Sequence, residues 1–112
     1  YVSDQEKHEV RRYGKNGDKK GTVVAGGHGR GVYLNRLNGP TYLFVDVQST
    51  LYVSDHNNHR VMKWMKGAKE GIVVAGGNVW GEDLTRLSYP SGVWVDGHGH
   101  VYVVEDGNHR VT

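Results

Sequence analysis

The sequence predicts an all-β fold made of a repeated unit of about fifty residues. Residues 21–27 return as residues 71–77, and residues 58–61 return as residues 108–111. Short β-rich runs are separated by Gly, Asn, Asp and Ser, a spacing typical of an antiparallel meander. No stretch combines a helical period with a cap. These three observations favour sheets of short strands.

The middle unit is expected to hold four strands. We expect them at residues 42–46, 51–55, 59–65 and 71–75. In the third run, Val61, Lys63 and Met65 alternate with Met62 and Trp64, so the two faces of the strand should differ in chemistry.

A long connection leads into the middle unit and into the last one, and each connection carries two leucines three positions apart. These are Leu34 with Leu37, and Leu84 with Leu87. The segments around them are too short and too rich in glycine to form more than a turn. We therefore expect the leucines to anchor each connection on the next unit.

Four strands and about fifty residues per unit describe the blade of a β-propeller, in which neighbouring sheets bury each other's faces. The sequence divides into a partial blade at 1–38, a complete blade at 39–88 and a second partial blade at 89–112. These are too few strands to close a ring. Open ends would expose apolar faces and strand edges, so we expect missing blades or, alternatively, self-association of copies.

The repeated segments resemble a known family. Residues 90–96 read P-S-G-V-W-V-D and residues 101–111 read V-Y-V-V-E-D-G-N-H-R-V, a pattern similar to the NHL repeat, and residues 52–61 match equally well. The resemblance implies part of an NHL propeller, which we expect to have six blades. It leaves the function open, because NHL propellers include RNA-binding regulators, protein-interaction scaffolds and an amidating lyase.

Residues that recur in the same place in several units are predicted to stabilise the blade. A charge-assisted hydrogen bond between Asp55 and Arg60 should lock the register of their hairpin, and Asn58 suits the turn between them. The first unit has Lys7 and Glu9 where the others have Asn and Arg, so Asp4 lacks this partner unless Arg11 or Arg12 substitutes. The predicted structural residues are Asp55, Asn58, His59, Arg60, Glu105, Asn108, His109 and Arg110.

The histidines do not predict a metal site. His8, His59 and His109 occupy equivalent positions in different units, so they should not converge on one ion and are expected to pack structurally. His98 and His100 flank a glycine in a turn, and two such ligands without a third make a poor site. We predict no metal, no cofactor and no catalytic residue.

Candidate binding residues come from the segments in which the units differ. The NHL resemblance implies that the connections at 28–39 and 78–89, with the turns at 56–57 and 106–107, line a ligand-binding face. Variable loops on a fixed frame are typical of binding surfaces. Aromatic and Arg side chains dominate interface energetics. The candidates are Arg30, Tyr33, Arg36, His56, Asn57, Trp80 and Arg86. In the alternative interpretation, Trp80 covers an adjacent loop while Arg36 and Arg86 bond local backbone.

The charge balance adds a second possible partner. The chain has 14 basic and 12 acidic side chains, and basic residues gather on the expected outer strands and hairpins. Such a rim could bind RNA or an acidic glycan, although a solvated outer edge explains it more simply. The cluster comprises Arg11, Arg12, Lys15, Lys19, Lys20, Lys63, Lys66 and Lys69.

The sequence therefore favours a non-catalytic binding or scaffold module whose partner is a protein. The alternatives are RNA or polyanion binding through the basic rim and, third, a lyase-like enzyme with metal-binding histidines and a catalytic tyrosine. No apolar run is long enough for a membrane span. The chain has no cysteine and no Asn-x-Ser/Thr acceptor, so neither a disulfide nor glycosylation points to an extracellular location.

Overall fold

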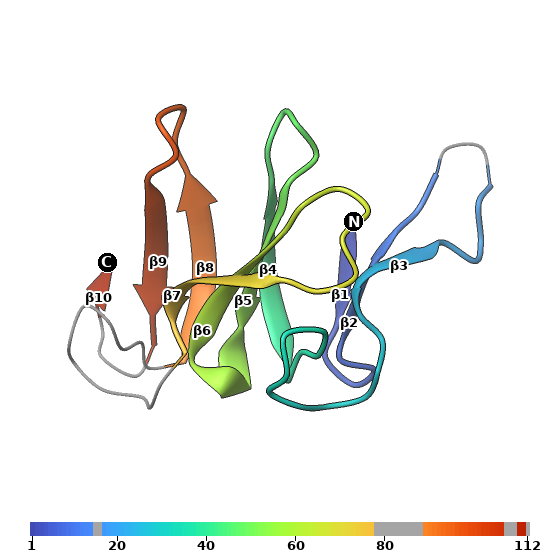
Figure 1. Ribbon diagram of the computed structural model, residues 1–112, viewed down its shortest axis with the longest axis horizontal. Helices are drawn as coiled ribbons and strands as arrows, with labels where there is room; N and C mark the ends of the chain where they lie inside the picture. The colour runs from blue at the N-terminus through green and yellow to red at the C-terminus, as the bar shows by residue number, and fades with distance from the viewer. Residues whose placement is uncertain (15–16, 78–88, 107–109, 112) are drawn as a thin grey trace.

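The computed structural model describes residues 1–14, 17–77, 89–106 and 110–111, and these form three antiparallel sheets that follow one another along the chain (Figure 1). The described ranges contain no α-helix, and no helix in them is long and apolar enough to cross a membrane. The prediction of an all-β fold is confirmed.

Within each sheet the strands lie in chain order. The first sheet contains β1 (Val2–Asp4), β2 (Glu9–Arg12) and β3 (Thr22–Gly26). The middle sheet contains β4 (Pro40–Val45), β5 (Leu51–Asp55), β6 (Arg60–Trp64) and β7 (Ile72–Gly76), with the short 3-10 helix η1 (His56–Asn58) between β5 and β6. The third sheet contains β8 (Pro90–Val95), β9 (Val101–Glu105) and β10 (Arg110–Val111).

The four strands predicted for the middle unit are present, with small shifts at their ends. β4 begins two residues earlier than expected, because Pro40 pairs with Asp55 ahead of a register shift between Pro40 and Tyr42. A proline at the first position of an edge strand removes no ladder hydrogen bond. The same shift recurs between Pro90 and Gly92 in the third sheet, so the irregularity belongs to the repeated unit.

Two separate hydrophobic clusters join the three sheets. One lies between the first and middle sheets and the other between the middle and third sheets. Along β5, Leu51 and Val53 enter the first cluster while Tyr52 enters the second; along β6, Met62 enters the first and Val61 the second. This alternation follows from the period of two along a strand. The two faces of β6 pack in different clusters, both of which are apolar.

The connection between β3 and β4, residues 27–39, is held between the first two sheets by one of its two leucines. Leu37 is fully buried in the first cluster. Leu34 is 42% exposed, and it is its backbone carbonyl that accepts a hydrogen bond, from Gly71 N–H at 2.8 Å. The prediction that both leucine side chains are anchors is therefore correct for Leu37 and wrong for Leu34. Leu84 and Leu87 lie outside the described residues.

Candidate functional site

A buried ion pair holds the β3–β4 connection in one conformation. Arg60 Nε donates to Asp55 Oδ2 at 2.7 Å, and the two side chains are 3% and 0% exposed. The guanidinium also donates to the Val32 carbonyl at 2.8 Å and to the Arg36 carbonyl at 3.0 Å. The ion pair expected within the hairpin is present, and Arg60 in addition bonds the backbone of the connection.

Asp55 and Asn58 complete this network. Asp55 Oδ1 accepts the backbone N–H of Asn38 at 2.7 Å, and Asn58 Nδ2 donates both to Asp55 Oδ2 at 2.9 Å and to the Gly31 carbonyl at 2.8 Å. Burial raises the pKa of Asp55, and the hydrogen bonds from Asn38, Asn58 and Arg60 oppose that rise. Because the bonds reach both ends of the connection, they fix the backbone between residues 31 and 38.

The middle of the connection carries a group of side chains that we call the loop tip: the exposed Arg30, Val32, Tyr33 and Leu34 and the partly buried Arg36. Tyr33 is 70% exposed. The guanidinium carbon of Arg36 lies 5.5 Å from the centre of the Tyr33 ring, a cation–π distance. Arg36 Nε is buried and has no hydrogen-bond partner among the described residues. The guanidinium of Arg36 thus contacts the Tyr33 ring. The local hydrogen bonds of Arg36 are made by its backbone, whose N–H donates to the Tyr33 carbonyl at 2.9 Å and whose carbonyl accepts from Arg60.

Two other candidate binding residues lie at the same end of the sheets, in η1 (Figure 1). Nδ1 of His56 lies 3.0 Å from the Pro90 carbonyl, to which it donates. Asn57 donates its backbone N–H to the Asn38 carbonyl at 3.1 Å and its amide to the Asn38 side chain at 3.3 Å. These polar groups join η1 to the third sheet and to the β3–β4 connection, and they do not form part of the loop tip.

Equivalent histidines link consecutive sheets through backbone hydrogen bonds. Nδ1 of His8 accepts the N–H of Gly39 at 3.0 Å, and Nδ1 of His59 accepts the N–H of Tyr89 at 3.0 Å. Both histidines have left-handed backbone, with φ of 55° and 52°. Because Nδ1 accepts, the ring N–H of each imidazole is at Nε2. The histidines were predicted to pack, and the structure gives them this specific polar contact.

The His59 contact predicts a pH dependence. Burial lowers the pKa of His59, and the nearby His56 lowers it further, so the unfolded chain binds this proton more readily than the folded chain. The stabilisation from His59 should be complete above about pH 6.5 and should be lost as the pH falls from there through the lower folded-state pKa. Urea unfolding between pH 5 and 8 measures the effect.

His59→Asn keeps a side-chain acceptor and removes the titration, so it should flatten the pH profile. The exposed His28, changed to Asn, is the matched control and should leave the profile as it is. An unchanged profile in His59→Asn would contradict the assignment.

His98 and His100 lie in a turn organised by a carboxylate. Asp96 accepts the backbone N–H groups of both histidines at 2.9 Å, and its other oxygen lies 3.0 Å from His100 Nδ1. The two histidines were expected to have no carboxylate nearby, and Asp96 shows that this expectation was wrong. In the part of the chain that the structure describes, no group of three or more His, Cys, Asp or Glu side chains could hold a metal ion.

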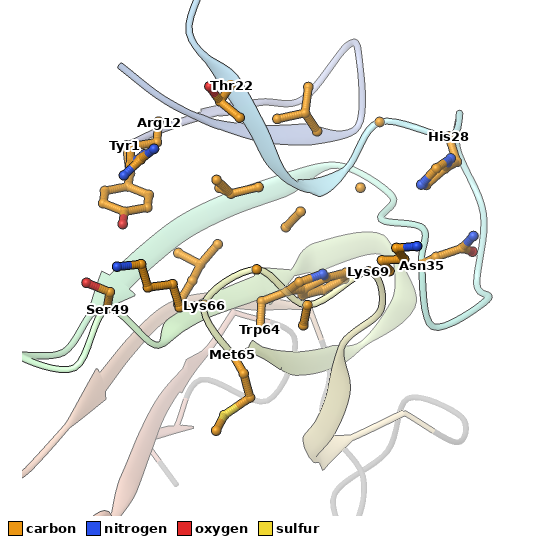
Figure 2. A pocket seen from close by; sticks show the side chains of 18 residues that line it. Tyr1, Arg12, Thr22, His28, Asn35, Ser49, Trp64, Met65, Lys66 and Lys69 are labelled. Carbon is orange, nitrogen blue, oxygen red and sulfur yellow. The ribbon is translucent and has the colours of Figure 1, made fainter. Parts of the chain in front are cut away.

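A cleft of about 760 Å³ opens between the first and middle sheets (Figure 2). Its walls come from β2 and β3 on one side and from the end of β6 and the β6–β7 loop on the other. Residues of the β3–β4 connection lie at one end of it. Sequence reasoning missed the cleft, because its walls come from segments far apart in the chain; the only signal was the presence of three cleft residues, Arg12, Lys66 and Lys69, in the basic cluster.

The other described members of the basic cluster do not line the cleft. Arg11 forms an ion pair with Glu9 and donates to the Lys20 carbonyl at 2.9 Å. Asp4, for which Arg11 or Arg12 was suggested as a partner, accepts the backbone N–H groups of Glu6 and Lys7. Lys15 lies outside the described residues.

For several of the predicted structural and binding residues, the structure describes no side chain. Trp80, Arg86, Asn108 and His109 lie outside the described residues, and Arg110 is described only as backbone in β10. Glu105 is buried and pairs in register with Arg110.

Comparison with family models and with curated proteins found no match for this chain. Among solved structures, the chain is similar to the crystal structure of an auxiliary nutrient binding protein from Bacteroides thetaiotaomicron VPI-5482, with a TM-score of 0.71 and 17% sequence identity. The similarity covers 96% of this chain and 32% of that one, so this chain spans about a third of its neighbour's length. At this identity, the likeness concerns the fold alone.

Proposed function

We propose that the chain is a segment of an NHL-type β-propeller that acts as a non-catalytic binding or scaffold module. The propeller assignment is supported by three consecutive antiparallel sheets, the middle one with four strands. It is also supported by the use of equivalent residues at the two sheet interfaces: Val10 and Ala25 in the first cluster correspond to Val61 and Ala75 in the second.

In this proposal residues 1–38, 39–88 and 89–112 belong to three consecutive blades of a six-bladed ring. This chain matches about a third of the similar nutrient binding protein. Such a match is expected if the three sheets form part of a larger fold. The similar protein is a nutrient binding protein, and a binding role is the class proposed for this chain.

The loop tip is the proposed contact surface for a protein partner, and the exposure of Tyr33 over a fixed backbone is the observation that carries this proposal. Tyr and Arg are the side chains that most often dominate interface energetics. Tyr33 is largely exposed, and Arg36 lies against its ring. Because Arg60 already holds the backbone carbonyls beneath them, little conformational entropy would be lost on binding.

Replacement of Tyr33 by Ala should weaken partner binding without changing Tm. A hot-spot side chain contributes about 2 kcal/mol or more, equivalent to ~30-fold in Kd. A photo-crosslinking amino acid at position 33 identifies the bound protein, and the same group at the fully exposed Val47, in the β4–β5 turn, is the positional control. The Kd of the identified partner is then measured with the Tyr33→Ala protein.

Tyr13→Ala, which removes an exposed tyrosine from the β2–β3 connection, is the matched substitution and should bind normally. Equal affinity of the Tyr33→Ala and unmodified proteins would reject the loop tip as the contact surface.

A further inference from the structure

The cleft between the first and middle sheets has an apolar interior. Val23 and Val24 of β3 form one wall, and Ala68 of the β6–β7 loop lies in the other. Trp64 and Leu51 close the bottom, where the cleft meets the first hydrophobic cluster. Its volume of about 760 Å³ lies within the usual range of small-molecule sites.

The charged side chains of the cleft are all cationic. Arg12 comes from one wall, and Lys66 and Lys69 come from the other. Figure 2 shows Arg12 and Lys66 at the same end of the cleft, next to Tyr1. Among the residues that the structure describes, no Asp or Glu lines the cleft, and none of these three cations has an ion pair. Positive charge beside an apolar, low-dielectric wall attracts anions more strongly than the same charge on an open surface.

We propose that the cleft binds a small organic anion with a flat apolar body and one acidic group, such as a carboxylate, phosphate or sulfonate. The apolar body would lie against Val23, Val24 and Ala68, and the acidic group beside Arg12 and Lys66. Polar groups that can add hydrogen bonds lie at both ends of the cleft, on Ser49 and Asn35 (Figure 2). This ligand site is separate from the protein-binding role proposed for the loop tip.

The probe is anilinonaphthalene sulfonate, an anion of this shape that absorbs where tryptophan emits. In a Trp80→Phe, Trp94→Phe protein, Trp64 is the one remaining tryptophan, so energy transfer to the probe reports binding near the cleft. Lys66→Gln with Lys69→Gln should weaken binding about tenfold or more, because bonds to charged groups are lost. Lys7→Gln with Lys19→Gln removes the same charge from outside the cleft and should change Kd by less than about twofold.

Three results would overturn the proposal. The neutral analogue phenylnaphthylamine could bind as tightly as the sulfonate, which would indicate apolar adsorption. The control pair of lysine substitutions could weaken binding as much as the cleft pair, which would indicate diffuse attraction of polyanions such as RNA. Energy transfer from Trp64 could be absent, which would place the probe away from the cleft.

The variants must remain folded for this comparison. All four lysines are exposed, so their substitution should leave the melting curve unchanged; if the cleft pair fails to fold, Arg12→Gln alone tests the same charge from the opposite wall. Tyr33→Ala should bind the probe normally, so failure of the cleft proposal and failure of the loop-tip proposal are distinguishable.

Discussion

Replacement of Arg60 by Leu is expected to lower the free energy of unfolding by about 3–5 kcal/mol, the usual cost of removing one partner from a buried ion pair. The change leaves the Asp55 carboxylate buried without its cation, and the carbonyls of Val32 and Arg36 lose their donors. Urea unfolding followed by circular dichroism measures the loss. The β3–β4 connection should also exchange its amide hydrogens faster, because its backbone is no longer held.

Arg30→Leu is the matched control, since Arg30 is an exposed arginine in the same connection; it should cost less than about 0.5 kcal/mol. Adding Asp55→Leu to Arg60→Leu removes the unpaired charge and should recover part of the lost stability. A cost below about 1 kcal/mol for Arg60→Leu would mean that the ion pair does not stabilise the fold.

Replacement of Leu37 by Ala is expected to cost about 2–5 kcal/mol, the range for truncating a buried leucine. Leu37 is fully buried in the cluster that joins the first and middle sheets. Its loss leaves a cavity between the sheets and loosens the connection from both. The free energy of unfolding in urea is the measurement.

Leu34→Ala makes the same chemical change three positions earlier, at a side chain that is substantially exposed. It should cost less than about 1 kcal/mol. Similar losses for Leu34→Ala and Leu37→Ala would contradict the burial described for this connection.

The sequence was sufficient to predict the strands and the contacts made within one hairpin. The period of two placed Val61 and Met62 on opposite faces of β6, and the structure assigns them to different clusters. Asp55 and Arg60 could be paired because they flank a short turn, where register follows from chain connectivity. Asp55 and Arg60 are direct register partners across β5 and β6.

Contacts between units could not be predicted in this way. Arg60 bonds carbonyls that precede it by more than twenty residues, and His59 accepts an N–H thirty residues ahead. The residue types of the partner segment do not reveal which backbone groups form these bonds, because every residue except proline carries both a donor and an acceptor. For the same reason the sequence did not distinguish Leu37 from Leu34, since only the path of the connection determines which leucine is enclosed.

Among the described residues, the two hydrophobic clusters have no member in common, and this division has a consequence for how the chain unfolds. The middle sheet is held by two independent contacts, one on each face, so the energetics are those of a linear array with nearest-neighbour coupling. Weakening the cluster around Val93 and Val103 should release the third sheet while the first two remain joined. Unfolding would then begin at one end of the array and proceed sheet by sheet.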